Sequence, residues 1–142
     1  MKKLLSLIAA TSILIVSCTK SANNPQNGNS NGSILTVVSK EFVITKFKDN
    51  SSGTDKASLF NGYTFIFNAN GTISAIKNNI TEKGSYTQKS SHEGEAAKLT
   101  IAFSNVPLSE LNKQFQIDLI SNNTIHLSDD GNASELLQFA AK

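Results

Sequence analysis

Cys18, His92 and a few acidic residues are the side chains in this 142-residue chain whose type and spacing suggest chemistry. Cys18 is the only cysteine, which excludes an internal disulfide and a cysteine-based metal site. Its role therefore has to be inferred from its position, directly after an apolar run near the amino terminus.

Two segments contain residues that can bind metal ions. His92 is followed by Glu93 and Glu95, and a histidine near two carboxylates can be a metal ligand. Asp129 and Asp130 carry oxygen atoms suited to calcium, but no glutamate follows at the spacing of a calcium loop. We interpret the first segment as a solvated polar loop and the second as a turn, and we predict no metal and no cofactor.

Three common kinds of catalytic motif are not found in the sequence. No serine lies in a Gly-x-Ser-x-Gly elbow, and no glycine-rich stretch forms a phosphate loop. Nothing places two carboxylates in a common cleft, as glycoside hydrolysis requires. We therefore expect a protein that is not an enzyme.

The first 17 residues have the organisation of a secretory signal peptide. Lys2 and Lys3 precede an apolar run at residues 4–16. This run is shorter than the roughly 20 residues that span a bilayer, but it suits a signal peptide. Residues 1–17 are therefore expected to be removed.

Ile15, Val16, Ser17 and Cys18 resemble a lipobox, in which an aliphatic residue, a tolerated residue and a small residue precede the cysteine. The resemblance implies cleavage between Ser17 and Cys18 by a lipoprotein signal peptidase, and acylation of Cys18. Two or three chains anchor a protein stably, because each buried CH₂ contributes about 0.8 kcal/mol and one chain binds only marginally. The alternative is an ordinary secretory signal with a coincidental cysteine.

Residues 18–33 are rich in Asn, Ser and Gly and are interpreted as the lipidated cysteine and a disordered polar tether. Lipoproteins retained at the inner membrane often carry Asp after the cysteine, and some surface-exported ones carry an acidic cluster there. Thr19 and Lys20 match neither group. The resemblance therefore implies a protein anchored in the outer membrane by lipid on Cys18 and facing the periplasm.

The charge of the chain gives no sign of nucleic-acid binding. Two of its thirteen basic residues, Lys2 and Lys3, lie in the signal peptide, and the remaining eleven equal the eleven acidic residues in number. All the basic residues are lysines, so the arginines that bind phosphate in a bidentate way are missing. We expect no nucleic-acid partner and a monomeric protein.

Residues 34–142 suit one domain made of about eight short strands and one short helical turn. The turn is expected at residues 107–112, with Pro107 in an early position. Short connections favour antiparallel up-and-down order, and eight strands can close into a barrel. We predict an all-β, eight-stranded antiparallel up-and-down barrel, with a two-sheet β-sandwich as the alternative. The strands are expected at 41–48, 63–67, 72–77, 82–88, 98–103, 115–119, 124–128 and around 137–139.

Within these strands, alternation predicts which side chains face the core. Leu99, Ile101 and Phe103 are expected on one face. Ile117 and Leu119 are likewise expected to share a face. Histidine 126 lies between two aliphatic residues and is expected to face outward.

The domain resembles the small lipocalin-like lipoproteins of Gram-negative bacteria over most of residues 40–140. The clearest match is residues 60–72, where a glycine precedes an aromatic strand and an Asn-Gly turn. Residues 84–86 resemble the group's Gly-small-Trp strand, and residues 108–111 with Phe115 resemble its short helix and next aromatic strand. The resemblance implies a lipocalin-like barrel, although the group is defined by shape more than by a shared reaction.

The chain departs from this group because it contains no Trp. Phe42, Tyr86 and Phe115 stand where the group often has Trp, and the Gly-x-Trp signature of true lipocalins is missing before Phe42. An aromatic replacement preserves the fold but weakens the inference about ligands.

Aromatic residues of the predicted barrel are the remaining candidates for a binding site. They can line a cup for a small apolar or amphipathic ligand, or they can fill the barrel, which then acts as a protein-interaction or inhibitor module. An interior cavity favours the first function, and a solid core with an exposed apolar patch favours the second. The candidate residues are Tyr63, Phe65, Phe67, Phe103 and Phe115, together with Phe139.

Replacing Cys18 by Ala tests the lipoprotein prediction. The Cys18→Ala variant is expected to lose its acyl label and to accumulate as uncleaved precursor, because the peptidase acts on the lipidated cysteine. Metabolic labelling with a fatty-acid analogue and the gel mobility of the chain measure both effects. A Ser21→Ala variant is the control, and normal processing of the Cys18→Ala variant would contradict the prediction.

Overall fold

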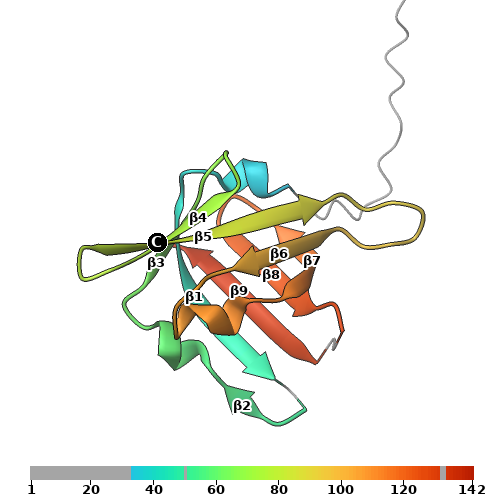
Figure 1. Ribbon diagram of the computed structural model, residues 1–142. Coiled ribbons are helices and arrows are strands. Elements are labelled where there is room, and N and C mark those ends of the chain that lie inside the picture. The colour runs from blue at the N-terminus through green and yellow to red at the C-terminus, as the bar shows by residue number, and fades with distance from the viewer. Residues whose placement is uncertain (1–32, 50, 132–133) are drawn as a thin grey trace, which may run out of the picture.

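The computed structural model describes residues 33–49, 51–131 and 134–142, which form a β-barrel (Figure 1). Eight antiparallel strands close the barrel, and a further strand, β2 (Thr54–Asp55), pairs with the end of β1. The barrel strands are β1 (Glu41–Asp49), β3 (Thr64–Phe67), β4 (Thr72–Lys77), β5 (Ile80–Lys89), β6 (Lys98–Ala102), β7 (Gln114–Ile120), β8 (Thr124–Asp129) and β9 (Glu135–Ala141).

Pairing between the first and last barrel strands distinguishes a barrel from a sandwich. β1 pairs with β9 through seven residue pairs, from Phe42 with Ala141 to Asp49 with Glu135. Each remaining barrel strand pairs with its neighbours in chain order. The predicted closed up-and-down barrel is therefore confirmed, and the two-sheet alternative is wrong.

Tight turns connect the first hairpins, as their residue types predict. Asn78 and Asn79 have positive φ angles of 52° and 63° and join β4 to β5 in two residues. Gly71, with φ of 80°, lies in the turn between β3 and β4. Asparagine and glycine tolerate this left-handed backbone better than other residues, which explains why these turns are readable from the sequence.

A β-bulge on β7 changes which residue faces the core. Strict alternation predicts Ile117 and Leu119 on the same face, but the register with β8 shifts between these two residues. Leu119 is 39% exposed, and Ile120 is buried instead. The expectation for Leu119 is therefore wrong, because an extra residue in one strand reverses the alternation beyond it. The carboxylate of Asp118 inside the bulge accepts a hydrogen bond from the Ser128 hydroxyl at 3.0 Å.

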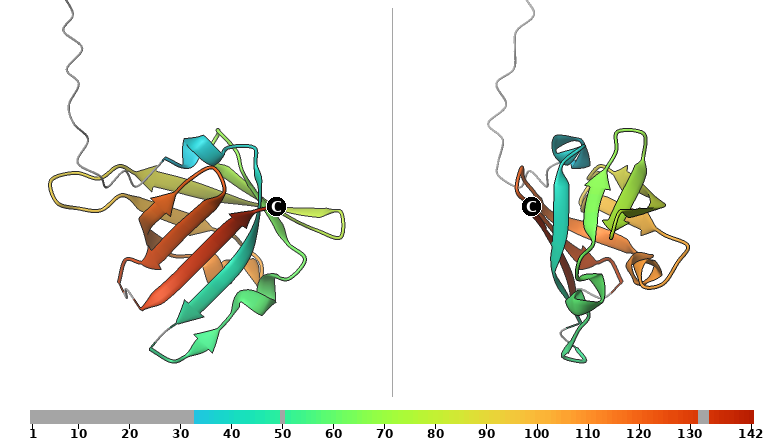
Figure 2. Two further views of the ribbon diagram at one scale, coloured as in Figure 1. Left: turned by 180° about the vertical axis from the view of Figure 1, so that it is seen from behind. Right: turned by 90° about the vertical axis from the view of Figure 1, so that its left-hand side faces the viewer.

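Three short 3₁₀ turns cover the two ends of the barrel (Figure 2). The turn η1 (Ile34–Val37) precedes β1 and buries Ile34 and Val37 at one end. The turns η2 (Ala57–Phe60) and η3 (Leu108–Leu111) lie at the other end, where Lys56 Nζ contacts Glu110 Oε2 at 2.8 Å. The sequence predicted only the turn around η3, which is confirmed.

Among residues 33–49, 51–131 and 134–142, no helix has the length and hydrophobicity needed to cross a bilayer.

Gly84 on β5 lies so close to β6 that a side chain does not fit there. A Cβ atom would lie 2.4 Å from the Ala102 carbonyl oxygen and 2.7 Å from the Phe103 ring. Gly84→Ala is expected to lower the free energy of unfolding by about 1–3 kcal/mol, as overpacking does. Urea denaturation measures the change.

Gly131→Ala is the control for this prediction. Its nearest atom, Asp129 Oδ1, lies 3.4 Å from the added Cβ, so a smaller effect is expected. Equal stability of the Gly84→Ala variant and the wild type would contradict the close approach of β5 to β6.

Candidate functional site

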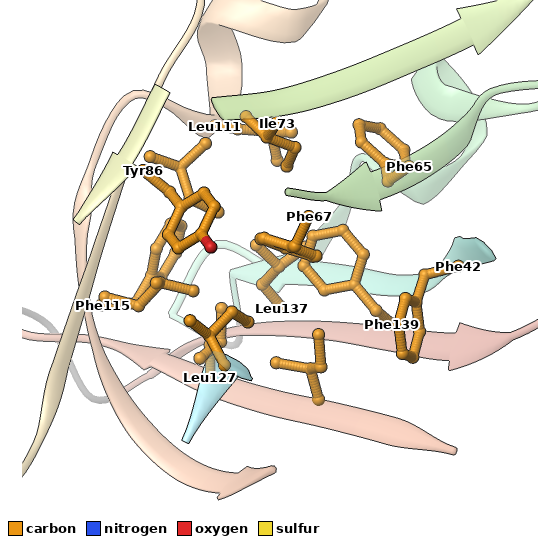
Figure 3. Close-up of a cluster of buried hydrophobic side chains, with 14 of the residues drawn as sticks. Phe42, Phe65, Phe67, Ile73, Tyr86, Leu111, Phe115, Leu127, Leu137 and Phe139 are labelled. Carbon is orange, nitrogen blue, oxygen red and sulfur yellow. The ribbon is translucent and has the colours of Figure 1, made fainter. Parts of the chain in front are cut away.

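The five aromatic residues predicted to contact a ligand all lie in the barrel core. None of them is more than 8% exposed. Figure 3 shows the side chains from β3, β7 and β9 pointing into one interior that they share with Tyr86 of β5. The five residues are Tyr63, Phe65, Phe67, Phe103 and Phe115.

The rings at the centre of this core are in direct edge-to-face contact. The centroid of Phe139 lies 5.5 Å from that of Phe65 and 5.8 Å from that of Phe67, with interplanar angles of 83° and 75°. Phe67 also contacts Tyr86 at 5.3 Å and Phe42 at 6.4 Å. Such pairs contribute about 0.5–1.5 kcal/mol each beyond burial. A ligand in this position would have to displace these rings.

Polar groups that could orient a ligand are also occupied by the chain itself. The Tyr86 hydroxyl donates a hydrogen bond to the Asn68 carbonyl oxygen at 2.7 Å, and burial raises the pKa of Tyr86. Within the described residues, no buried side-chain nitrogen or oxygen lacks a hydrogen-bond partner. Ligand sites usually combine an apolar pocket with a few convergent polar groups. Within the described residues, the buried side chains of the core offer no unpaired polar atom that could take this role.

Tyr63 lies at the η2–η3 end of the core. Its ring lies 4.8 Å from Lys77 Nζ, a cation–π contact. Burial raises the pKa of Tyr63, and the negative charge of Glu82 raises it further. The buried ring of Tyr63 thus lies beside two charged side chains, those of Lys77 and Glu82, at this end of the core.

An open hollow of about 540 Å³ lies outside the barrel, between residues 91–96 and β7. His92, Glu93, Glu95 and Asp118 are among its lining residues. His92 and Glu93 are exposed, and 3.8 Å separate His92 Nε2 from Glu93 Oε1. In the part of the chain that the structure describes, no three His, Cys, Asp or Glu side chains are arranged to hold a metal ion.

Asp129 and Asp130, considered above as calcium ligands, bind lysines instead. Lys113 Nζ contacts Asp129 Oδ2 at 3.3 Å, and Lys98 Nζ contacts Asp130 Oδ2 at 2.8 Å. Asp129 Oδ1 accepts a hydrogen bond from the Gly131 amide at 2.8 Å, as expected in a turn. His126 is partly exposed between buried Ile125 and Leu127, so the outward orientation predicted for it is observed. 

Ser17 and Cys18, the residues predicted for cleavage and lipidation, lie outside the described residues. The same is true of the predicted signal peptide and of nearly all of the predicted tether. Cleavage and lipidation therefore stay predictions.

Comparison with solved structures shows a likeness in fold. A crystal structure of a DUF4847 family protein from Bacteroides vulgatus matches with a TM-score of 0.52 and 18% identity, over 77% of this chain and 96% of that chain. A protein from Burkholderia xenovorans, solved by NMR, matches with a TM-score of 0.47 and 14% identity, over 98% of this chain and 99% of that chain. No protein-family model matches the chain, and no curated protein matches it. The barrel fold is thus shared with the Bacteroides protein.

A charged cluster fixes the strand ends beside the Asp129 turn. Lys113 Nζ contacts Glu135 Oε2 at 2.6 Å and Asp129 at 3.3 Å, and Glu135 is buried. Burial of Lys113 disfavours its charge, but hydrogen bonds to Glu135 and Asp129 outweigh burial and raise the pKa of Lys113. This cluster holds together the start of β9, the end of β8 and the residue preceding β7.

Lys113→Met is expected to lower the free energy of unfolding at pH 7 by about 1–3 kcal/mol, because charge-assisted hydrogen bonds are lost. Folding raises the pKa of Lys113. The contribution of Lys113 to the free energy of unfolding is therefore fully present below its pKa in the unfolded chain, about 10.4, and is lost as pH rises through its pKa in the folded protein. Urea denaturation at pH 7 and about pH 11 should therefore show a smaller difference between variant and wild type at the higher pH.

Lys48→Met is the matched control, since Lys48 makes no ion pair within the described residues. A Lys113→Met variant that is as stable as this control at pH 7 would contradict a stabilising role for the cluster.

Proposed function

We propose that this protein is a lipid-anchored, non-catalytic lipoprotein of the cell envelope whose filled barrel acts as a protein-interaction module. The observation that carries this proposal is the packing of the core. The Phe139 ring contacts both Phe65 and Phe67 at the position that a ligand of a hollow barrel would occupy. Because its interior is taken up by its own side chains, the barrel can offer partners only its outer surface and its loops.

Closure of both barrel ends supports the same function. Ile34 and Val37 of η1 are buried at one end, and Phe60 of η2 and Leu108 of η3 are buried at the other. A barrel that admits a ligand needs an open mouth or a lid that moves. Here short turns with buried apolar side chains occupy both positions.

Exposed apolar side chains give the outer surface a means of binding. Four large hydrophobic residues in the described part of the chain are well exposed: Leu59, Ile80, Val106 and Leu119. The interaction or inhibitor module was expected to combine a solid core with an exposed apolar patch, and these four residues are the large apolar groups that the described surface offers to a partner.

The lipid anchor inferred for Cys18 would keep this module at the outer membrane, facing the periplasm. The 14 residues between Cys18 and Ser33 can extend to about 46–50 Å at most. Their polar, Gly- and Asn-rich composition suits a flexible tether. The barrel would then be able to reach partners well away from the bilayer surface.

Native mass spectrometry of the mature chain, purified from the envelope of its host, tests whether a ligand is bound. The expected result is the mass of the acylated chain with no stoichiometric adduct. The control is a Cys18→Ala variant that is secreted with an ordinary signal peptide. Because it carries no lipid, it is purified without detergent, which could remove a bound ligand from the acylated chain. A one-to-one adduct in either preparation that disappears on denaturation would contradict the proposal and would identify the ligand class.

A further inference from the structure

The pairing between β6 and β7 ends before β7 itself ends. The ladder joins residues 98–100 of β6 to residues 114–116 of β7, and beyond it the Ile117 amide donates a hydrogen bond to the Ala97 carbonyl oxygen at 2.8 Å. β7 continues to Ile120, with β8 paired on its other side. Within the described residues, no strand pairs with residues 118–120 on the β6 side. This end of β7 is therefore an edge of the sheet.

The open hollow of about 540 Å³ lies beside this edge. Gln116, Ile117 and Asp118 of β7 line it on one side, and residues 91–96, which connect β5 to β6, line it on the other. Figures 1 and 2 show this connection extending away from the barrel wall. The hollow thus lies where the chain departs from β7 and leaves the edge open. An open strand edge can bind an extended peptide through backbone hydrogen bonds.

The tip of the β5–β6 connection forms a defined turn. The backbones of His92 and Glu95 exchange two hydrogen bonds, at 3.3 and 2.8 Å. Between them, Glu93 and Gly94 have φ angles of 40° and 90°, as in a two-residue hairpin turn. Asparagine, aspartate or glycine is preferred at the first of these positions. The turn itself therefore gives no reason for a glutamate at position 93.

Carboxylates dominate the charge of the hollow. Glu93, Glu95 and Asp118 line it, and among its described lining residues none is a lysine. Lys98, where β6 begins, is held by Asp130 at 2.8 Å. Charge complementarity between partners favours a segment with lysine or arginine side chains at this place. The anionic headgroups of a bilayer would be repelled by the same carboxylates.

Leu119 adds an apolar contact at the same edge. It follows Asp118 on β7, and the bulge turns its side chain outward, where it is 39% exposed. A strand added at this edge would lie about 4.7–4.9 Å from β7, so its side chains could pack against Leu119. Backbone pairing, an apolar contact and negative charge are thus combined in one surface.

We propose that this surface binds an extended segment of a partner protein that carries lysine or arginine side chains. We call it the β7 edge site, formed by Glu93, Glu95, Asp118 and Leu119. The segment adds as a strand to residues 118–120, with its positive charges beside the three carboxylates. The proposal rests on the interaction function proposed above and assigns that function to one surface.

Site-specific photo-crosslinking in the native host tests the site on the full anchored chain. A photoreactive phenylalanine analogue replaces Ser91, which lines the hollow, or Leu119. It replaces Val106, which precedes η3 and is 83% exposed, as the matched control. The expected result is one crosslinked protein, the same from Ser91 and Leu119 and not obtained from Val106.

Removal of charge in the same assay tests the carboxylates. The triple variant Glu93→Asn, Glu95→Gln and Asp118→Asn is expected to lower the yield of crosslinked partner at least about tenfold, since three charge contacts are lost. Asparagine suits the turn at position 93 and keeps an oxygen for Ser128 at position 118, so thermal unfolding should be unchanged. Glu41→Gln, on the outer wall, is the control and should leave the yield unchanged. An unchanged yield from the triple variant would overturn the proposed site.

Binding of the purified partner to the anchored chain then tests how the segment binds. Raising the salt from about 0.01 M to about 1 M, which shortens the Debye length from about 30 Å to about 3 Å, should weaken binding at least about tenfold. Hydrogen exchange should become slower at the amides of residues 118–120 when the partner is bound. Residues 136–140 of β9, which are paired on both sides, are the control. Binding that does not depend on salt, or unchanged exchange at residues 118–120, would contradict the proposal.

Other results separate failure of this surface from failure of the proposed function. A specific protein crosslinked only at Val106 would overturn the β7 edge site but leave the interaction function in place. Crosslinks from Ser91 and Leu119 to phospholipid or to a second copy of this chain would overturn the proposed partner. The absence of any crosslinked protein from all three positions would overturn both proposals.

Discussion

Edge-to-face packing of Phe139 against Phe65 and Phe67 is the interaction on which the rest of the structure depends. These rings come from β9 and β3, the two barrel strands that flank β1. β1 pairs with β9 over seven residue pairs but with β3 over only two. Because few backbone hydrogen bonds join β1 to β3, packing of rings across the interior has to stabilise the barrel at this seam.

The filled interior also accounts for the short turns that cover the barrel ends. These turns in turn account for some of the exposed apolar side chains. Short strands leave the outermost core residues close to solvent, so apolar side chains of η1, η2 and η3 cover them. Each 3₁₀ turn directs some side chains inward and others outward. In η2, Phe60 enters the core while its neighbour Leu59 stays exposed. The same 3₁₀ turn thus places one apolar side chain in the core and leaves the next one exposed to solvent.

Residue types and spacing predicted the eight barrel strands, because alternation and Asn-Gly turns act locally. They favoured a closed barrel but left the two-sheet sandwich open, since the pairing of β1 with β9 joins residues far apart in the sequence. The two-residue strand β2 was not predicted. Four-residue 3₁₀ turns have no periodicity to detect. The turn η3 was predicted because Pro107 precedes it, whereas no proline marks η1 or η2, and these two were missed. The bulge at Asp118 was also missed, because it depends on pairing with β8 and not on β7 alone. The aromatic residues were expected inside the barrel and are buried there, but a ring that lines a cavity and a ring that fills it look alike in a sequence. Only their mutual distances distinguish the two.

A high-resolution crystal structure of the protein purified from its native host is the most direct test of the central claim, that the barrel is filled by its own side chains. We expect electron density in the interior for protein atoms alone, with Phe139 in contact with Phe65 and Phe67. Density for a bound molecule between these three rings, with the rings rotated aside, would contradict it.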